Sequence, residues 1–118
     1  MLRFLFLFIA LLIAVPASAQ NALTGTWKSD LGSATLTFES DGTYKLTSPG
    51  EFDYGGKYTL SGQSVTFEDA FGSQVCPGIQ GIYNFNMVVN SIEFVPVDDF
   101  CAERRDHLRG NWTNAGLL

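Results

Sequence analysis

Few residues of this chain have the types and spacing that catalysis needs. His107 is the single histidine, and it follows Arg104 and Arg105 in a segment that resembles a short helix. Ser-His-Asp catalysis needs a histidine held between both partners, whereas a histidine late in a helix commonly serves as a cation there. Asp98 and Asp99 are adjacent, so their side chains point apart, and helix capping accounts for them. We therefore predict that the protein is not an enzyme and has no catalytic residue.

Metal and cofactor binding are also weakly indicated. Two cysteines and one histidine at wide spacing do not supply the ligand pairs of a zinc site. A calcium ion needs six or more oxygen ligands in a compact arrangement, and the acidic stretches 51–53 and 98–99 offer too few. We predict no metal and no cofactor.

The two cysteines, Cys76 and Cys101, are predicted to form a disulfide. An exported chain meets an oxidising compartment, where a single pair of cysteines is most simply a bond. A catalytic thiol is the alternative, and it would need His107 as its base. Closing a loop of this length would stabilise the fold by about 3 kcal/mol in the chain-entropy model.

The first residues have the pattern of a secretory signal peptide. Arg3 precedes an apolar run from Phe4 to Val15, and Pro16 and the small residues 17–19 follow. The run is shorter than the ~20 residues of a membrane span, although an N-terminal anchor is the alternative. We predict a signal peptide over residues 1–19, one domain over residues 20–118, no stable membrane anchor, and export to a bacterial periplasm or the medium.

Charge excludes two classes of partner. The whole chain has a formal net charge of −5, and removal of the leader takes away Arg3 and makes the balance more acidic. Nucleic-acid binding usually requires a basic face, so we predict no nucleic-acid partner. The same balance disfavours an anionic membrane surface.

Period-two alternation of apolar and polar residues dominates the rest of the chain and indicates β-strands. Only the segment 98–110 lacks this alternation, and it predicts a helix over 100–109, capped by Asp98 or Asp99 and ended by Gly110. Arg104, Arg105, His107 and Arg109 would lie late in this helix. The expected strands are 25–29, 33–40, 43–48, 56–60, 64–69, 81–88, 91–97 and 110–114.

A Leu-x-Gly-x-Trp motif occurs at both ends of the predicted domain, at Leu23–Trp27 and Leu108–Trp112. Eight antiparallel strands leave two exposed edges unless the sheet closes on itself. Closure would pair the first strand with the last and bring the two motifs together in opposite directions, although chance could also explain so short a repeat. The predicted fold class is all-β, a closed eight-stranded antiparallel up-and-down barrel with one short helix before the last strand.

The sequence resembles a known family in places. Residues 25–28, Gly-Thr-Trp-Lys, are similar to the opening of lipocalins and fatty-acid-binding proteins, the calycin barrels. The chain also resembles small exported bacterial lipocalin-like proteins of unknown function, through Cys76-Pro77-Gly78, Gly81-x-Tyr83, Asp98-Asp99-x-Cys101-x-x-Arg104 and Trp112. The resemblance implies a small lipocalin-like barrel and little about its activity. The chain is far shorter than lipocalins usually are.

In an up-and-down barrel, successive connections lie alternately at the two ends of the barrel. The tight turns near 41–42, 61–63 and 90–91 would lie at one end, and the longer connections, both cysteines and the helix at the other. This second end, the rim, carries many acids and four aromatic residues predicted to lie in loops and bind a partner, namely Phe52, Tyr54, Phe71 and Phe100. Alternatively, the acids are solvated or pair with Arg104, Arg105 and Arg109 while the rings pack beneath the loops.

The inward faces of the strands are predicted to be apolar or phenolic, without Arg, Lys, Asp or Glu. An interior ligand would therefore be small, neutral and apolar, because a buried carboxylate would lack a cationic partner. The alternative is an interior filled by its own side chains. The candidate ligand-binding residues are Tyr44, Tyr58, Phe67, Tyr83, Phe85 and Phe94, and Phe38, Leu46, Leu60, Val65, Met87 and Ile92 are expected on the same faces.

Together these features favour an exported, non-enzymatic binding module that takes a small neutral apolar molecule at the barrel mouth. The alternative is a periplasmic protein-interaction or inhibitor module that uses the acidic and aromatic rim. The sequence leaves the identity of the ligand or protein partner and the oligomeric state open.

Overall fold

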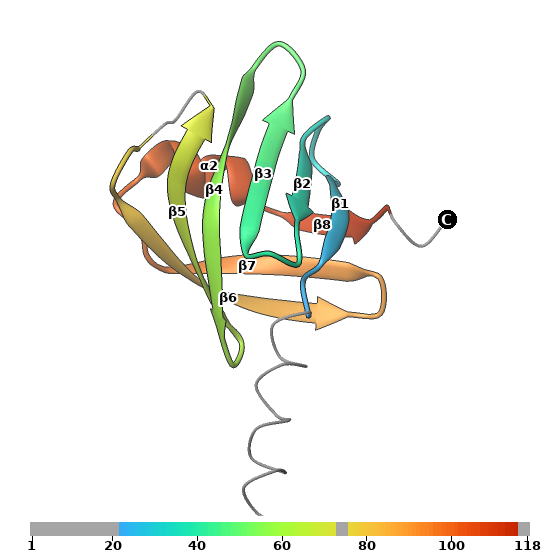
Figure 1. The fold of residues 1–118 in the computed structure, drawn as a ribbon. Helices are drawn as coiled ribbons and strands as arrows, with labels where there is room; N and C mark the ends of the chain where they lie inside the picture. The colour runs from blue at the N-terminus through green and yellow to red at the C-terminus, as the bar shows by residue number, and fades with distance from the viewer. Residues whose placement is uncertain (1–21, 73–75, 116–118) are drawn as a thin grey trace, which may run out of the picture.

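The computed structural model describes residues 22–72 and 76–115, so the predicted signal peptide lies outside the described residues. Eight antiparallel strands form a closed barrel in sequence order, and one short helix precedes the last strand (Figure 1). This confirms the predicted fold class. The strands are β1 (Gly25–Ser29), β2 (Thr35–Phe38), β3 (Thr43–Ser48), β4 (Phe52–Ser61), β5 (Ser64–Gly72), β6 (Gln80–Val88), β7 (Ser91–Asp98) and β8 (Asn111–Asn114), and the helix is α2 (Ala102–Leu108).

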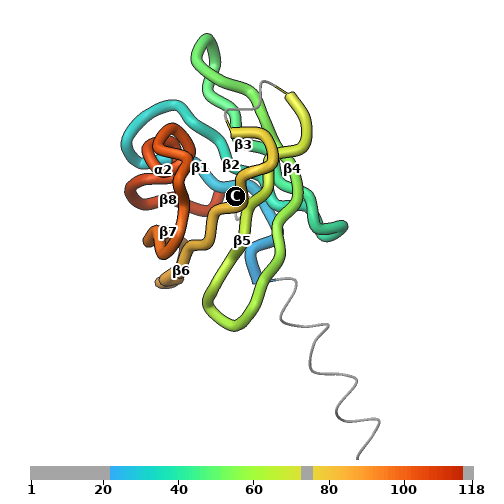
Figure 2. Tube along the Cα trace, turned by 90° about the vertical axis from the view of Figure 1, so that its left-hand side faces the viewer, coloured from blue at the N-terminus to red at the C-terminus, as the bar shows by residue number. Residues whose placement is uncertain are grey.

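Closure of the barrel depends on the pairing of β1 with β8. Trp27 pairs with Asn114 and Ser29 pairs with Trp112, so the strands run in opposite directions. Strand β8 also pairs with β7 on its other side. Figure 2 shows β1, β8 and α2 gathered on one side of the molecule. The predicted approach of the two tryptophan segments is therefore confirmed, and no edge of the eight-strand sheet is left open.

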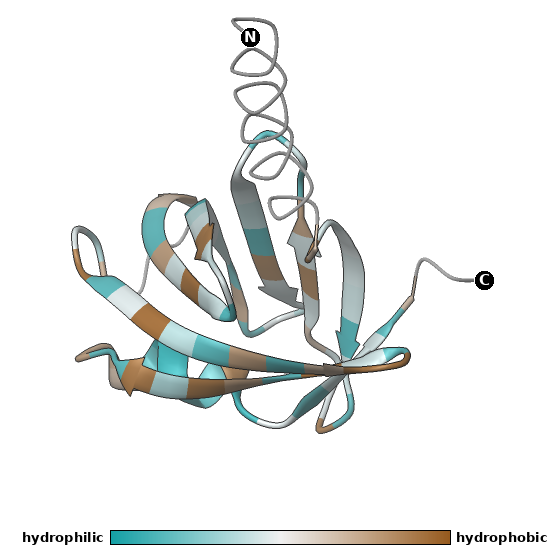
Figure 3. Ribbon diagram, turned by 90° about the horizontal axis from the view of Figure 1, so that it is seen from below, coloured by the Kyte–Doolittle hydropathy of each residue, from teal (hydrophilic) through white to brown (hydrophobic). Residues whose placement is uncertain are grey.

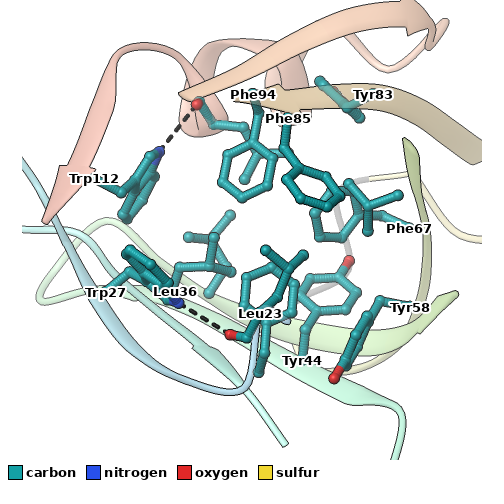
Figure 4. Packing of buried hydrophobic residues seen from close by; sticks show 14 of the residues in the cluster. Leu23, Trp27, Leu36, Tyr44, Tyr58, Phe67, Tyr83, Phe85, Phe94 and Trp112 are labelled. Atoms are coloured by element: carbon teal, nitrogen blue, oxygen red, sulfur yellow. Dashed lines mark hydrogen bonds between the residues drawn. The ribbon is translucent and has the colours of Figure 1, made fainter. Parts of the chain in front are cut away.

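The two Leu-x-Gly-x-Trp motifs form the same local structure. The indole N–H of Trp27 donates to the carbonyl oxygen of Leu23, and that of Trp112 donates to Leu108, each at 3.1 Å (Figure 4). The intervening glycines have φ values of 134° and 89°, which other residues rarely adopt. In each motif the chain passes through the glycine into a strand, and the buried indole donates to a carbonyl of the same motif, although Leu108 ends α2 and Leu23 lies in a turn.

The core consists of the inward side chains of all eight strands, and apolar and polar residues alternate along the ribbon as the pattern predicts (Figure 3). Phe67 lies at the centre of an aromatic network. Its ring centroid is 4.9 Å from that of Tyr44, 5.6 Å from Tyr83 and 5.9 Å from Phe94. These rings contact one another across the interior (Figure 4).

Met87 does not belong to this core, and the prediction that it faces inward is wrong. Its side chain is 43% exposed, whereas Phe85, two residues earlier on β6, is buried. Met87 lies one pair from the end of the β6–β7 hairpin, opposite Ile92. Ile92 is fully buried and belongs to the core, so the edge of the core runs between the two members of this pair.

Strand β4 is longer than predicted. It begins at Phe52 instead of Gly56, so Phe52 and Tyr54 lie on a strand and not in a loop. Strand β5 extends to Gly72, which also places Phe71 on a strand. Glycines 55 and 56 suggest a loop by composition, but here they allow neighbouring chains to approach closely at a register shift between β4 and β5.

We predict that Gly56→Ala destabilises the fold by about 3 kcal/mol, because a side chain there overpacks the sheet. Its Cβ would lie 1.9 Å from the carbonyl oxygen of Glu68 and 2.8 Å from the amide nitrogen of Ala70. Chemical denaturation measures the loss. Gly32→Ala is the control, because nothing lies within 4 Å of its Cβ. Equal stability of the two variants would contradict the close approach.

Candidate functional site

Helix α2 covers the barrel end at which the long connections meet. Its residues contact the start of β4, the end of β5 and the segment just after β7. The predicted gathering of long connections, cysteines and helix on one rim is therefore what the topology produces. The predicted helix 100–109 is shorter, Ala102–Leu108, and its N-cap is Cys101, which makes no side-chain capping bond.

Arg104 anchors the helix to the barrel. Its side chain is fully buried, and its guanidinium binds Asp99 through two nitrogens, both at 2.8 Å. A third nitrogen donates to Asp69 on β5 at 2.9 Å, and the carbonyl oxygen of Ile79 accepts a further bond at 2.8 Å. Arginine suits this position because its planar fork can satisfy two carboxylates at once.

The two aspartates receive further hydrogen bonds from the barrel. The hydroxyl of Tyr44 donates to Asp69 at 2.7 Å, and that of Tyr83 donates to Asp99 at 2.5 Å. A buried carboxylate is costly unless such donors replace its water. Across the part of the chain that the structure describes, every buried side-chain nitrogen and oxygen has a partner. The cluster is thus a satisfied polar plug between core and helix.

The disulfide joins the two sides of this plug. Cys76 and Cys101 are bonded, as predicted, with their Cα atoms 6.0 Å apart. The backbone N–H of Cys76 donates to Asp69, and that of Cys101 donates to Asp99. The covalent bond therefore fixes the spacing of the two carboxylates that bind Arg104.

The pKa shifts follow from this network. Burial alone would raise the pKa of Asp99, but hydrogen bonds from Arg104, Tyr83 and the Cys101 amide outweigh it and hold that pKa below its usual range. Burial would lower the pKa of Arg104, yet its two carboxylates raise it. Burial raises the pKa of Tyr44 and Tyr83, and their bonds to aspartate raise it further, so both phenols stay protonated.

These contacts correct two expectations. The inward faces were expected to carry no charge, but Asp69 is 4% exposed and lies among the core residues of β5. Arg104 was expected late in the helix, but it lies in the first turn of α2 and is fully buried. Its ion pairs with Asp69 and Asp99 agree with the alternative in which rim acids pair with arginines. The alternation of Val65 and Phe67 continues to Asp69, and Cys101, Arg104 and Leu108 have helical spacing. The first signal was available, because the predicted strand 64–69 already includes Asp69, whereas the second required the correct start of the helix.

Asp99 was expected to cap the helix. Its carboxylate does accept the Cys101 amide, but the same group binds Arg104 and Tyr83 inside the barrel end. Its backbone carbonyl accepts from Arg105. Asp99 therefore links the N-terminal end of the helix to the core, and it is not the N-cap residue.

His107 lies on the same helix and contacts β4. Its Nδ1 is 2.9 Å from the hydroxyl of Tyr54, and its ring stacks on Phe52 with centroids 3.9 Å apart. Burial lowers the pKa of His107, although Asp106, Glu103, Glu51 and Asp69 oppose this. Burial also raises the pKa of Tyr54, so the phenol keeps its proton. The tautomer of the imidazole sets which of the two groups donates in this hydrogen bond.

Two clefts flank α2, and Asp106 and Arg109 line both. The first, the helix–β7 groove, has a volume of about 440 Å³ and contains Phe94, Pro96 and Ala102 together with Arg105. The second, the His107 cleft, has a volume of about 360 Å³ and lies between α2, the β1–β2 connection and the β3–β4 turn.

The candidate residues fall into separate places. All six candidate ligand-binding residues, Tyr44, Tyr58, Phe67, Tyr83, Phe85 and Phe94, are core residues with 0 to 7% exposure. Among the rim aromatics, Phe52 lines the His107 cleft and Tyr54 is fully buried beneath it. Phe71 is 44% exposed and Phe100 is 86% exposed. Alternation alone missed both clefts, because they depend on where α2 lies.

Metal and membrane features were also sought in the described residues. Within 22–72 and 76–115, no group of three or more His, Cys, Asp or Glu side chains could hold a metal ion. No helix in these ranges is long and apolar enough to cross a membrane.

We predict that Arg104→Met lowers the free energy of unfolding by about 3–5 kcal/mol, because two buried carboxylates lose their cation. Arg109→Met is the matched control, since the Arg109 side chain is 72% exposed, and it should change stability by less than about 0.5 kcal/mol. Denaturant melts compare the two. Similar small losses in both variants would show that Arg104 does not hold the barrel end.

We also predict that His107 titrates below its ordinary pKa of 6.5, because burial disfavours the imidazolium. The unfolded chain then binds the proton more readily, so this histidine's contribution to stability is present above about pH 6.5 and is lost as the pH falls. NMR of the single imidazole gives the midpoint directly. A midpoint above 6.5 would mean that the surrounding acids outweigh burial.

No protein-family model matches the chain, and neither a curated protein nor a solved structure was found to match it. The geometry of the barrel end therefore carries the functional argument.

Proposed function

We propose that this chain is an exported, non-enzymatic, lipocalin-like binding module that takes a small, neutral, apolar molecule in the helix–β7 groove at the barrel mouth. The observation that carries this proposal is the groove itself, about 440 Å³ in volume and containing Phe94, Pro96 and Ala102. Small-molecule sites are commonly concave and mostly apolar, with a few polar groups at their edge, and this volume falls in their usual range.

The charges at the groove favour a neutral ligand. Arg105 already donates to the backbone carbonyl of Asp99, and Arg109 lies 3.8 Å from the carboxylate of Asp106. A charged ligand would have to compete with these partners. The aliphatic stems of the arginines can instead cover an apolar molecule. The aromatic network around Phe67 occupies the interior, which supports a site at the mouth over one deep in the barrel.

Non-enzymatic function agrees with the way the polar groups are used. Arg104, Asp69 and Asp99 bind one another in a buried plug, and His107 bonds to a phenol whose pKa is raised by burial. Tyr54 is fully buried, so a substrate does not reach its hydroxyl and this Tyr–His pair is poorly suited to covalent catalysis. Export is supported by the disulfide, which persists in oxidising compartments, and by the leader pattern of the sequence.

One observation favours the alternative, a protein-interaction or inhibitor module. Phe100 is 86% exposed and Val97, three residues earlier, is 58% exposed, beside the disulfide. Exposed aromatic residues are frequent anchors in protein interfaces. This alternative places the partner on the outer edge of the rim and leaves the groove without a role.

Ala102→Trp tests the groove. The indole would fill the apolar floor, so binding of the neutral fluorescent probe N-phenyl-1-naphthylamine should weaken by about tenfold or more, equivalent to 1.4 kcal/mol. Ala70→Trp is the control, an exposed alanine on β5 that does not line the groove. Unweakened probe binding in Ala102→Trp would contradict the groove as the site. Loss of probe binding in Phe100→Ser would place the site on the outer rim.

A further inference from the structure

We propose that the His107 cleft is a second binding site, which takes a neutral sugar ring. It lies on the other side of α2 from the helix–β7 groove, and the two clefts share only Asp106 and Arg109. The inference therefore goes beyond the proposed apolar site and can fail or hold independently of it.

The cleft has an aromatic wall that is fixed in place. The imidazole of His107 stacks on Phe52 at an interplanar angle of 18°, and both rings line the cleft. The hydroxyl of the fully buried Tyr54 holds the imidazole through Nδ1. A flat, prearranged face of this kind suits the C–H face of a sugar ring, because little side-chain entropy is lost when the ligand binds.

The polar side chains of the cleft lie beside Phe52, because Ser48 is its cross-strand partner, and they are also prearranged. Ser48 is 2% exposed, and its hydroxyl donates to Glu51 at 2.5 Å and lies 3.4 Å from the hydroxyl of Ser33. The Glu51 amide bonds back to the Ser48 carbonyl and closes the β3–β4 turn. A carboxylate has about four acceptor sites, so the bond from Ser48 leaves Glu51 capacity for a ligand hydroxyl.

The cleft contains both donors and acceptors. Glu51 and Asp106 supply carboxylate acceptors, Arg109 supplies guanidinium donors, and His107 adds a ring nitrogen that donates or accepts according to its tautomer. Sugar hydroxyls both donate and accept, so one ring can meet all of these groups. The cleft also contains Leu31 and Ala34, which can contact the carbon atoms of the ring.

Other ligand classes fit these walls less well. An anion would face the carboxylates of Glu51 and Asp106, and a cation would face Arg109. A wholly apolar molecule would remove these groups from water without replacing their hydrogen bonds, which is costly. A neutral ring that has both hydroxyl groups and an apolar face avoids all three penalties.

The test is an NMR titration of the mature protein with glucose, galactose, mannose and N-acetylglucosamine, each up to about 100 mM. A small ligand with few contacts should bind with a dissociation constant on the order of 10 mM. We expect at least one sugar to shift amide signals in the segments 29–34, 48–52 and 106–109, with saturation. The absence of saturable shifts for every sugar would overturn the proposal.

A matched pair of variants locates the site. Phe52→Leu removes the aromatic face but keeps an apolar side chain, and it should weaken sugar binding by about fivefold or more, a change of about 1 kcal/mol. Phe71→Leu changes the same residue type on another part of the rim and should leave binding unaltered. If Phe52→Leu fails to fold, Glu51→Gln is compared with Phe71→Leu instead. It should also weaken sugar binding, because it removes the carboxylate, while its side-chain oxygen can still accept from Ser48.

Two further results separate the alternatives. Sugar binding should persist in Ala102→Trp, because Ala102 lines only the helix–β7 groove, and its loss there would overturn the assignment to the His107 cleft. Glycine, acetate and ethylammonium are titrated in parallel as zwitterion, anion and cation. Tighter binding of any of them than of every sugar would overturn the assignment to a neutral ring.

Discussion

The barrel end depends on one buried cation held between two carboxylates. Arg104 reaches from α2 to Asp69 on β5 and to Asp99 just before the helix, and the disulfide fixes the segments on either side. Such a cluster is not a strong source of net stability, because desolvation offsets most of the attraction. Its effect is positional, since this placement of α2 satisfies all three charges away from water.

The position of α2 in turn creates the surfaces on which function can be argued. A short helix laid across one end of a round barrel cannot cover it completely, so a cleft opens along each side. One cleft borders β7 and is largely apolar, and the other borders the β3–β4 turn and is polar. Because core side chains fill the interior, a ligand or partner meets the surface, where these clefts and the exposed ring of Phe100 lie.

The sequence predicted much of the fold because the fold follows local rules. Period-two alternation located all eight strands, and the paired tryptophan motifs indicated closure, which β1 and β8 confirm. The errors occurred where tertiary contacts override composition. Glycines 55 and 56 predict a loop but lie within β4, where a close approach to β5 requires them, and Met87 continues the alternation beyond the end of the core.

The sequence by itself determined the all-β class, the cysteine pair and the end of the barrel at which the long connections lie, since each follows from the order of residues along the chain. Only the tertiary structure decided that Asp69, Asp99 and Arg104 form a buried plug and that His107 stacks on Phe52. The reason is physical. The contacts of Asp69 with Arg104 and of Phe52 with His107 join residues far apart in the sequence. They depend on strand register and on the exact position of a helix, and neither is encoded in local periodicity.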